Sequence, residues 1–252
     1  MIILLTNDDG INAPGLRALF NALQGLGELW VVAPLHERSG VSHAFTPQGP
    51  LRVEESVWDG IRVYAVEGNP ADAVKIAVRS LLPEKPALVV SGINNGENTG
   101  IDLIYSGTVA GAREGAIFGI PALAMSKLSK NYPDFSASAA FARRMSQWIL
   151  ERGLPPGILL NVNVPARPES QIRGVRITHQ AASRYEEVVD RQSLGDGVSA
   201  CDWVDYYKIL AEDGHGSDFE AVKAGFISVT PVHHRLTDFD FIPQLERWDW
   251  TM

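Results

Sequence analysis

The stretch "LLTNDDGINAPG", residues 4–15, decides the fold. An apolar run at 2–5 stops at two adjacent aspartates, and Pro14 then opens a segment whose leucines recur at helical spacing. A short continuous apolar run of this kind is typical of a strand that is covered on both faces. A second apolar run, "LWVVAP" at 29–34, follows the helix. The order of strand, helix and strand predicts a right-handed βαβ unit and therefore a parallel sheet.

The same alternation continues along the chain. The segment "NPADAVKIAVRSLL" at 69–82 places an asparagine at the N-cap position and a proline at the first helical position, which predicts a helix. The other predicted elements are strands at 61–66, 87–91, 121–126 and 157–165 and helices at 106–119 and from about residue 134. We therefore expect an α/β fold with three layers, αβα, around a mostly parallel, Rossmann-like sheet.

Beyond residue 165 the alternation weakens. The polar, glycine-rich segment at 183–217 is typical of an excursion built from strands, and "EAVKAGFISVTP" then predicts a short helix and a strand. We expect a single domain over residues 1–252 with three parts: a core of about 1–182 and 218–232, a β-rich inserted arm of about 183–217, and a C-terminal tail, 233–252. The aromatic residues of the tail, Trp248 and Trp250, suggest either an interface or a loosely packed terminus.

Composition narrows the function classes. The chain has 252 residues, 45% of them hydrophobic and 21% charged, which is the profile of a globular protein. Its net charge of -8 argues against electrostatic binding of duplex nucleic acid. The single cysteine, Cys201, excludes an intramolecular disulfide. The N-terminal apolar run is too short for a signal peptide, and no later run reaches the length of a membrane span, so we expect a cytoplasmic protein without a membrane partner.

Oxygen-rich loops follow three of the predicted strands. Asp8 and Asp9 follow the first, Ser39 follows the second, and Asn94 follows the strand at 87–91. In an open parallel sheet ligands bind at the carboxyl edge, and these loops meet there if the three strands are neighbours. Carboxylate, hydroxyl and amide oxygens are the ligands of hard divalent cations such as Mg²⁺ or Mn²⁺, and such an ion would relieve the repulsion between adjacent aspartates. Asp and Asn before glycine are also common in turns, so "NDDG" alone leaves a simple turn open.

The segment "IYSGTVAGAREG" adds a candidate anion site. Ser106, Gly107 and Thr108 precede a predicted helix, whose first N–H groups and dipole favour a phosphate. The alternative is that Ser106 is only an N-cap and that the glycines allow close helix packing. The segment lacks the Lys-Ser/Thr ending of a P-loop, and no GxGxxG follows the first strand, which argues against a P-loop kinase and a dinucleotide-dependent oxidoreductase.

The remaining candidates are histidines and one arginine. His233 and His234 are adjacent in a predicted strand and should point to opposite faces, so joint metal binding is not expected. His36 and His43 lie near Ser39 in the sequence and could approach the site, although loop histidines are more often solvated. Arg38 is either a phosphate contact or an ordinary exposed arginine. No GxSxG motif supports a serine hydrolase.

Taken together, these segments resemble a known family. In order and spacing, the segments "ILLTNDDGINAPGL", "VVAPLHERSGVSHAFT", "GNPADAV", "VVSGINNGENTGIDLIYSGTVAGAREG", "LNVNVP" and "GFISVTP" resemble the survival protein SurE family over residues 2 to about 232. The resemblance implies the SurE-like αβα fold. It also implies a divalent-metal-dependent phosphatase that acts on nucleoside 5′-monophosphates, often on 3′-monophosphates, and in some members on short polyphosphate.

The resemblance also implies site residues and assembly. The metal ligands would be Asp8, Asp9, Ser39 and Asn94. The phosphate-binding residues would be Ser39, Gly40, Asn94, Ser106, Gly107 and Thr108. The arm and the C-terminal segment commonly exchange between subunits in this family, which implies a homodimer or homotetramer.

The reaction that these residues predict is hydrolysis of a phosphomonoester, and the resemblance implies a nucleoside monophosphate as the small-molecule substrate. Asp8 or Asp9 could orient or deprotonate the attacking water, or attack phosphorus covalently, and the residues leave both routes open. The main alternative is a non-catalytic nucleotide-binding regulator on the same fold, because a fold does not fix a function.

Overall fold

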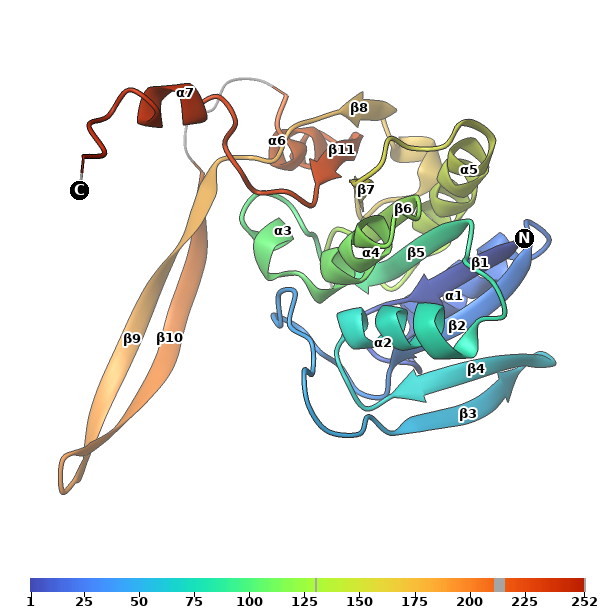
Figure 1. Ribbon diagram of the computed structural model, residues 1–252, viewed down its shortest axis with the longest axis horizontal. Helices are drawn as coiled ribbons and strands as arrows, with labels where there is room; N and C mark the ends of the chain where they lie inside the picture. Colours follow the sequence, from blue (N-terminus) through green and yellow to red (C-terminus); the bar gives the residue numbers. More distant parts are fainter. Residues whose placement is uncertain (130, 211–215, 252) are drawn as a thin grey trace.

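The computed structural model describes residues 1–129, 131–210 and 216–251. Within these residues, nine strands form the central sheet: β1 (Ile2–Thr6), β2 (Glu28–Pro34), β3 (Val53–Trp58), β4 (Ile61–Val66), β5 (Leu88–Asn95), β6 (Ala122–Lys127), β7 (Ile158–Val164), β8 (Val175–Ile177) and β11 (Ile227–His233). Their order across the sheet is β3-β4-β2-β1-β5-β6-β7-β11-β8 (Figure 1). The first strand thus lies near the middle, where both of its faces are covered.

The inner strands are parallel, as the βαβ pattern predicts. β1 pairs in parallel with β2 and β5, and the parallel pairing continues outward to β4 on one side and to β6 and β7 on the other. Antiparallel pairs occur toward the edges, where β3 pairs with β4 and β11 pairs with β7. All five residues of β1 are buried, which agrees with an apolar run that carries no alternation.

Helices cover both faces of the sheet. The helices are α1 (Pro14–Leu23), α2 (Pro70–Ile76), α3 (Asp102–Tyr105), α4 (Gly107–Ile117), α5 (Ser136–Arg152), α6 (Asp218–Lys223) and α7 (Ile242–Leu245), with a π-helical turn, Ala77–Leu81, after α2 and a 3₁₀ turn, Glu169–Gln171. α1 and α5 pack together on one face, whereas α2 and α4 pack together on the other. The three-layer αβα architecture is therefore confirmed (Figure 1).

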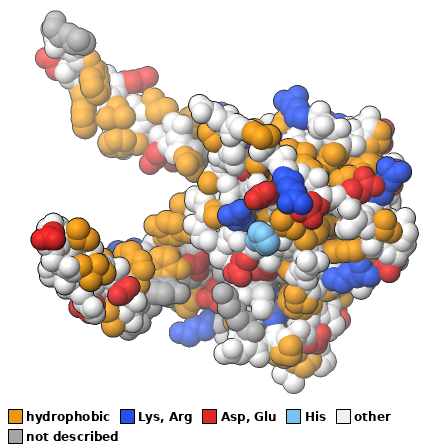
Figure 2. Space-filling model, turned by 90° about the horizontal axis from the view of Figure 1, so that it is seen from below, with side chains coloured by type: hydrophobic (Ala, Val, Ile, Leu, Met, Phe, Trp, Pro, Cys, Tyr) orange, Lys and Arg blue, Asp and Glu red, His pale blue; other side chains and the backbone are white. Residues whose placement is uncertain are grey.

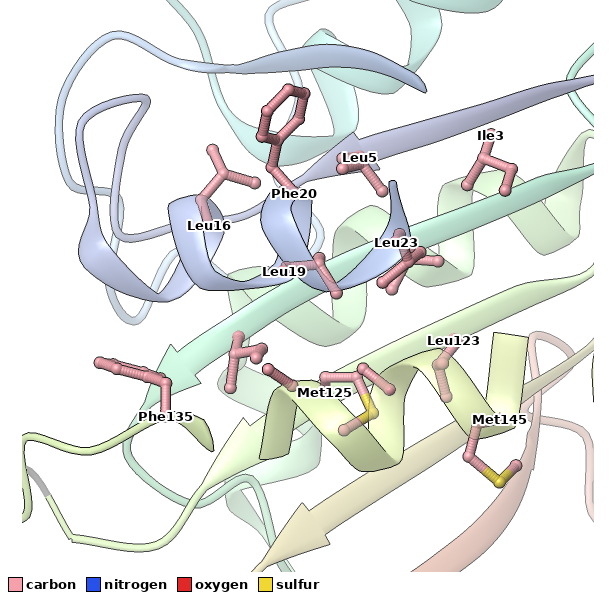
Figure 3. Close-up of a cluster of buried hydrophobic side chains, with 14 of the residues drawn as sticks. Ile3, Leu5, Leu16, Leu19, Phe20, Leu23, Leu123, Met125, Phe135 and Met145 are labelled. Atoms are coloured by element: carbon pink, nitrogen blue, oxygen red, sulfur yellow. The ribbon is translucent and has the colours of Figure 1, made fainter. Parts of the chain in front are cut away.

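The α1 side of the core shows why this helix forms where it does. Leu16, Leu19, Phe20 and Leu23 recur at helical spacing and are fully buried. Figure 3 shows these side chains above the sheet, close to Ile3 and Leu5. Pro14 stands at the start of the helix, where its missing N–H costs no hydrogen bond. Burial of each such side chain contributes about 2 kcal/mol, so the stripe fixes the helix against the sheet.

Most predicted elements are present, but β3 is an addition to the prediction. The strand pairs with β4 across a two-residue turn, and both turn residues, Asp59 and Gly60, have positive φ angles. An Asp-Gly pair between two strands is a strong hairpin signal, so the sequence did contain an indication of β3. The strand lies at the sheet edge with none of its residues fully buried, and its residues "VEESVW" lack a clear apolar face.

Two segments project from the αβα layers. β9 (Ser183–Gly195) and β10 (Val198–Leu210) form an antiparallel hairpin, which lies within the segment where the sequence predicted an arm built from strands (Figure 1). The C-terminal segment with α7 projects separately, and its Trp248 and Trp250 rings are stacked and exposed. Hydrophobic side chains gather along both projections (Figure 2). In the part of the chain that is described, no helix has the length and apolar character needed to cross a membrane.

The prediction that His233 and His234 point to opposite faces of a strand is wrong. β11 ends at His233, so His234 is no longer held in the alternation of a strand. The two rings lie with centroids 4.7 Å apart, next to Gly157, whose carbonyl is 3.2 Å from Nδ1 of His234. Both rings therefore lie on the same side of the chain.

Candidate active site

A cavity of about 500 Å³ opens at the carboxyl edge of the sheet. Six of the residues that the sequence singled out line it: Asp8, Asp9, Ser39, Gly40, Asn94 and Ser106. They come from the loop after β1, the loop after β2, the end of β5 and the start of α4. Because the three strands are neighbours in the sheet, loops that are far apart in the sequence meet in one place.

Gly107 and Thr108 lie behind the cavity wall. Both are buried and neither is among the lining residues. The Thr108 hydroxyl donates a short hydrogen bond to Oδ1 of Asp8. A Cβ atom on Gly107 would lie 2.8 Å from Cβ of Asp8 and 3.1 Å from the carbonyl oxygen of Arg38. The start of α4 therefore packs directly against Asp8, and only a glycine allows this approach.

Asp8 is a buried acid of the site with a strongly raised pKa. Its side chain is 4% exposed. Burial raises its pKa to about 7, and the neighbouring Asp9 charge adds to that rise, whereas the hydrogen bonds from Thr108 lower it. A buried carboxyl group beside a second one gains most from a nearby cation, since the cation stabilises its charged form.

The loop after β5 holds Asp9 and Asn94 in place. The backbone N–H of Asn95 donates to Oδ2 of Asp9 at 3.2 Å. The side-chain Nδ2 of Asn94 donates to the carbonyl of Gly96 at 2.9 Å, which fixes the orientation of the amide. The backbone N–H of Asn98 in turn donates to Asn163 Oδ1 at 2.8 Å, so β7 anchors the loop.

The loop after β2 brings Ser39 to the site. The backbone N–H of Arg38 donates to the carbonyl of Asp8 at 2.7 Å, which ties this loop to the loop after β1. The Ser39 hydroxyl donates to Glu37 at 2.6 Å, so its oxygen lone pairs are oriented away from that contact. The Arg38 side chain, a candidate phosphate contact, does not line the cavity.

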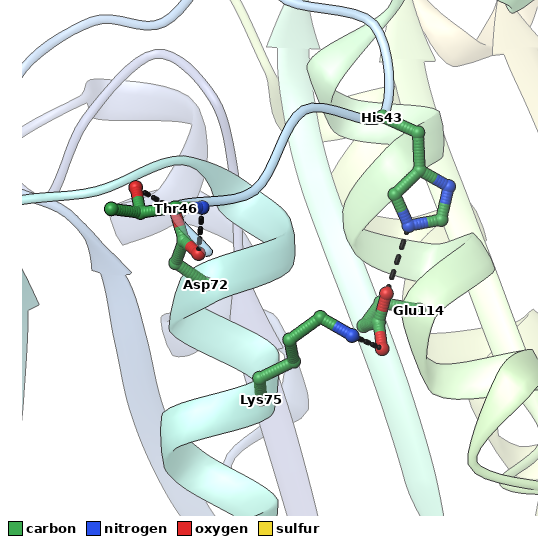
Figure 4. A network of polar contacts seen from close by, with 5 residues as sticks. All are labelled: His43, Thr46, Asp72, Lys75 and Glu114. Atoms are coloured by element: carbon green, nitrogen blue, oxygen red, sulfur yellow. Dashed lines mark hydrogen bonds and ion pairs between the residues drawn. The ribbon is translucent and has the colours of Figure 1, made fainter. Parts of the chain in front are cut away.

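His43 lies outside the cavity and belongs to a different network. Its Nε2 is 2.9 Å from a carboxylate oxygen of Glu114, and Lys75 donates to the other oxygen at 2.6 Å (Figure 4). Burial alone would raise the pKa of Glu114, but the contacts with His43 and Lys75 outweigh it and hold that pKa below its usual range. Thr46 donates to Asp72 on α2 in the same region. The network fastens residues 41–46, which follow Ser39, to α2 and α4.

Eight further residues line the cavity that the sequence argument did not single out: Asn95, Gly96, Glu97, Asn98, Asp102, Tyr105, Ser129 and Tyr185. Most belong to the asparagine- and glycine-rich loop after β5 or to the adjoining α3, so the position of that loop was a usable signal. Tyr185 is on β9 in the arm, and no local pattern in the sequence links it to the site.

The charged side chains that line the cavity are all acidic. The lining includes the carboxyl groups of Asp8, Asp9, Glu97 and Asp102, and none of the described lining residues is a lysine, arginine or histidine. A phosphate group would be repelled by such a surface. The cavity therefore requires a cation if it is to receive an anionic ester.

The oxygen atoms at the site suit a hard divalent cation. Across the described residues, no group of three or more His, Cys, Asp or Glu side chains could hold a metal ion, so a metal here must also take hydroxyl or amide oxygens. The Asp8–Asp9 pair, Ser39 and Asn94 supply such a set. In addition, Oδ1 of Asn7 and Oδ1 of Asn95 are buried without a hydrogen-bond partner among the described atoms. Of these two residues Asn95 lines the cavity together with Asp8 and Asp9, and an unsatisfied oxygen there favours a positively charged occupant.

Comparisons with known proteins agree with this arrangement. A family model described as "Survival protein SurE" matches residues 3–187. A protein named 5′-nucleotidase SurE from Symbiobacterium thermophilum is 47% identical, with 99% of both chains covered. A protein of the same name from Moorella thermoacetica is 44% identical over 97% of this chain and 95% of its own.

The fold comparison gives the same answer. The crystal structure of the SurE protein from Aquifex aeolicus superimposes with a TM-score of 0.83 at 36% sequence identity, and the match covers 98% of each chain. The family model, the full-length relatives and the fold all point to one family, so this chain belongs to the survival protein SurE family.

Proposed function

We propose that this chain is a divalent-metal-dependent phosphomonoesterase that hydrolyses nucleoside 5′-monophosphates to nucleoside and phosphate. Nucleoside 3′-monophosphates and short polyphosphate are proposed as further substrates. The observation that carries the proposal is the convergence of Asp8, Asp9, Ser39 and Asn94 in one acidic cavity of a SurE-family chain. The curated relatives, named 5′-nucleotidases, support the same activity.

The residues fit a Mg²⁺ or Mn²⁺ ion. Asp8, Asp9, Ser39 and Asn94 would hold it, and when bound it supplies positive charge that neutralises a phosphate and polarises phosphorus. The all-oxygen ligand set favours these two metals over zinc.

The start of α4 provides the second element of the proposed site. Ser106 lines the cavity and is the N-cap of α4, since its Oγ accepts the Val109 N–H at 3.1 Å. The positive end of the helix dipole therefore faces the region next to Asp8, where it favours phosphate oxygens and the charge that develops on them in the transition state.

The two aspartates have different surroundings, which suit different roles. Asp8 is buried and held by Thr108, so we assign it to positioning and to charge. Asp9 is only partly buried and reaches the cavity, so it is placed to orient or deprotonate the attacking water. The stereochemical course of hydrolysis, followed with a substrate made chiral at phosphorus by oxygen isotopes, tests this assignment: inversion supports direct attack by water, whereas retention or a trapped aspartyl phosphate contradicts it.

The activity itself is tested by phosphate release from a panel of nucleoside monophosphates with Mg²⁺, with Mn²⁺ and with EDTA. We expect release that depends on the metal. Nucleotide binding by folded protein without any release would instead support the non-catalytic regulator.

A variant pair locates the activity in this cavity. We expect Asp9→Asn to lose metal affinity and turnover together and to keep the fold. Asp59→Asn is the matched control, because Asp59 lies in the β3–β4 turn and pairs with Arg17 at 2.6 Å, away from the lining residues. Full activity in Asp9→Asn would refute the role of this carboxylate.

We also propose a cytoplasmic location and a homodimer or homotetramer that does not bind duplex nucleic acid. The single, unpaired and exposed Cys201 is compatible with a reducing compartment. The acidic net charge of -8 disfavours duplex binding. The apolar residues exposed on the hairpin and the tail, such as Trp203 and Trp250, support self-association. Light scattering measures the number of subunits.

A further inference from the structure

One wall of the cavity is aromatic and has no part in the proposed phosphate chemistry. Tyr105 ends α3 and Tyr185 lies on β9, and both line the cavity. Their ring centroids are 6.1 Å apart and the ring planes are tilted by 38°. The Tyr185 hydroxyl donates a short hydrogen bond to Oδ1 of Asp102, which also lines the cavity.

The base of the arm holds Tyr185 firmly against the loop that lines the cavity. The backbone N–H of Ile101 donates to Oγ of Ser183 at 2.7 Å, two residues before Tyr185. Gln180 Nε2 donates to the carbonyl of Gly100 at 2.8 Å. The buried carboxylate of Asp218 accepts the N–H groups of both Gly100 and Ala181, each at 3.0 Å. Tyr185 is therefore preorganised beside Tyr105, so ligand binding would cost little entropy for ordering the Tyr185 side chain.

The aromatic pair lies next to the proposed phosphate site. Tyr105 immediately precedes Ser106, the N-cap of α4, and its side chain remains 48% exposed. Stacked rings lie about 3.5 Å apart, so an inserted ring would need about 7 Å between the two tyrosines. A centroid separation of 6.1 Å does not allow insertion, so a planar ligand can lie only across the outer face of the pair.

We propose that Tyr105 and Tyr185 form a stacking platform for the nucleobase, and that Asp102 positions the Tyr185 ring through its hydroxyl. This inference rests on the proposed function, because it assigns the base-binding part of the same cavity. A platform that offers aromatic faces accepts purines and pyrimidines alike, because every base has a π-face. It favours nucleotides over phosphate esters that have no base.

The test compares AMP with ribose 5-phosphate, which has the same sugar phosphate and no base. We expect Tyr185→Leu and Tyr105→Leu to raise KM for AMP on the order of tenfold, with little change in kcat. The KM for ribose 5-phosphate should not change in these variants. The variants should therefore lose the preference for AMP that the parent protein shows. Tyr185→Phe keeps the ring but loses the hydrogen bond to Asp102, so we expect a rise in KM for AMP that is smaller than in Tyr185→Leu. Trp203→Ala is the control, because Trp203 is a 70% exposed aromatic residue of the arm outside the cavity lining.

Each outcome separates this inference from the proposed function. If the parent protein releases phosphate from neither compound, the proposed function fails. If it is active but does not prefer AMP, or if the leucine variants change both substrates by the same factor, the platform is overturned while the phosphatase stands. If a leucine variant has a lower melting temperature than the parent protein, Tyr185→Phe and Tyr185→Trp replace it in the test. Both variants keep an aromatic ring and should keep the preference for AMP. Loss of the AMP preference in both variants would overturn the platform.

Discussion

The Thr108 hydroxyl donates a hydrogen bond to Oδ1 of Asp8, one hundred residues earlier in the chain. This contact joins the first turn of α4 to the loop after β1. The Thr108 hydroxyl therefore contacts the Asp8 carboxylate and does not itself line the cavity. The protonation of Asp8 therefore depends on a residue that no substrate needs to touch.

Thr108→Val should weaken the proposed activity without disturbing the fold. Valine has a similar shape but no donor, so the pKa of the buried Asp8 carboxyl should rise further. Hydrogen bonds to charged groups contribute about 1.5 to 3 kcal/mol, which corresponds to at least a tenfold loss in kcat/KM at neutral pH. The pH–rate profile should move upward in pH. Thr108→Ser retains the hydroxyl and is the control, and an unchanged profile in the valine variant would contradict the role of the contact.

Asp8 should destabilise the metal-free protein as the pH rises. Its pKa is about 7 in the folded protein and 3.8 in the unfolded reference, so the folded state binds more protons between these values. In EDTA, the free energy of unfolding should fall between about pH 4 and pH 7, by at most on the order of 4 kcal/mol from this group.

Asp8→Asn should flatten that dependence. At pH 7 in EDTA the variant should unfold at a higher urea concentration than the parent protein. Added Mg²⁺ should stabilise the parent protein more than the variant, because the variant keeps only Asp9 as a charged ligand. Urea midpoints at pH 4.5, 5.5 and 7 measure both effects, and parallel curves for the two proteins would contradict the raised pKa.

Alanine substitutions at two glycines of α4 should have different effects, because one glycine packs against the site and the other packs against the core. A Cβ on Gly107 would lie 2.8 Å from Asp8 Cβ, whereas a Cβ on Gly115 would lie 2.8 Å from a methyl carbon of Val89 in the core. Gly107→Ala should therefore displace Asp8 and remove most activity. Gly115→Ala should lower the melting temperature and leave the activity of the folded fraction intact. Equal losses of activity in the two variants would contradict this assignment.

Glu114→Gln should lower stability at neutral pH by about 2 kcal/mol, because it leaves Lys75 and His43 without a charged partner. The pKa of Glu114 is lowered in the folded protein, so its contribution is present above the unfolded value of 4.5 and is lost as the pH falls through the folded value. The difference in urea midpoint between variant and parent should be largest at pH 7 and small near pH 3. A difference that does not depend on pH would show that the loss comes from packing.

Local pattern was sufficient for most of the fold. The stripe of Leu16, Leu19, Phe20 and Leu23 predicted α1, the uninterrupted apolar run predicted a central strand, and prolines at the first helical positions marked the starts of α1 and α2. These signals depend on neighbours within one or two turns, so they survive without tertiary information. β3 was missed because its exposed edge position removes the apolar face that pattern recognition needs, and the His233–His234 geometry was missed because the strand ends between them.

The sequence by itself determined the αβα class, the mostly parallel sheet and the polar loops that follow its strands, because those follow from periodicity and chain direction. The tertiary structure decided that β2, β1 and β5 are neighbours, so that these loops meet. Only the tertiary structure decided which side chains face the cavity. In the tertiary structure Gly107 and Thr108 lie behind Asp8. His43 contacts Glu114 outside the cavity, and Tyr185 of the arm lies beside Tyr105. These outcomes depend on contacts between residues about 70 to 100 positions apart, and such contacts leave no periodic trace in the chain.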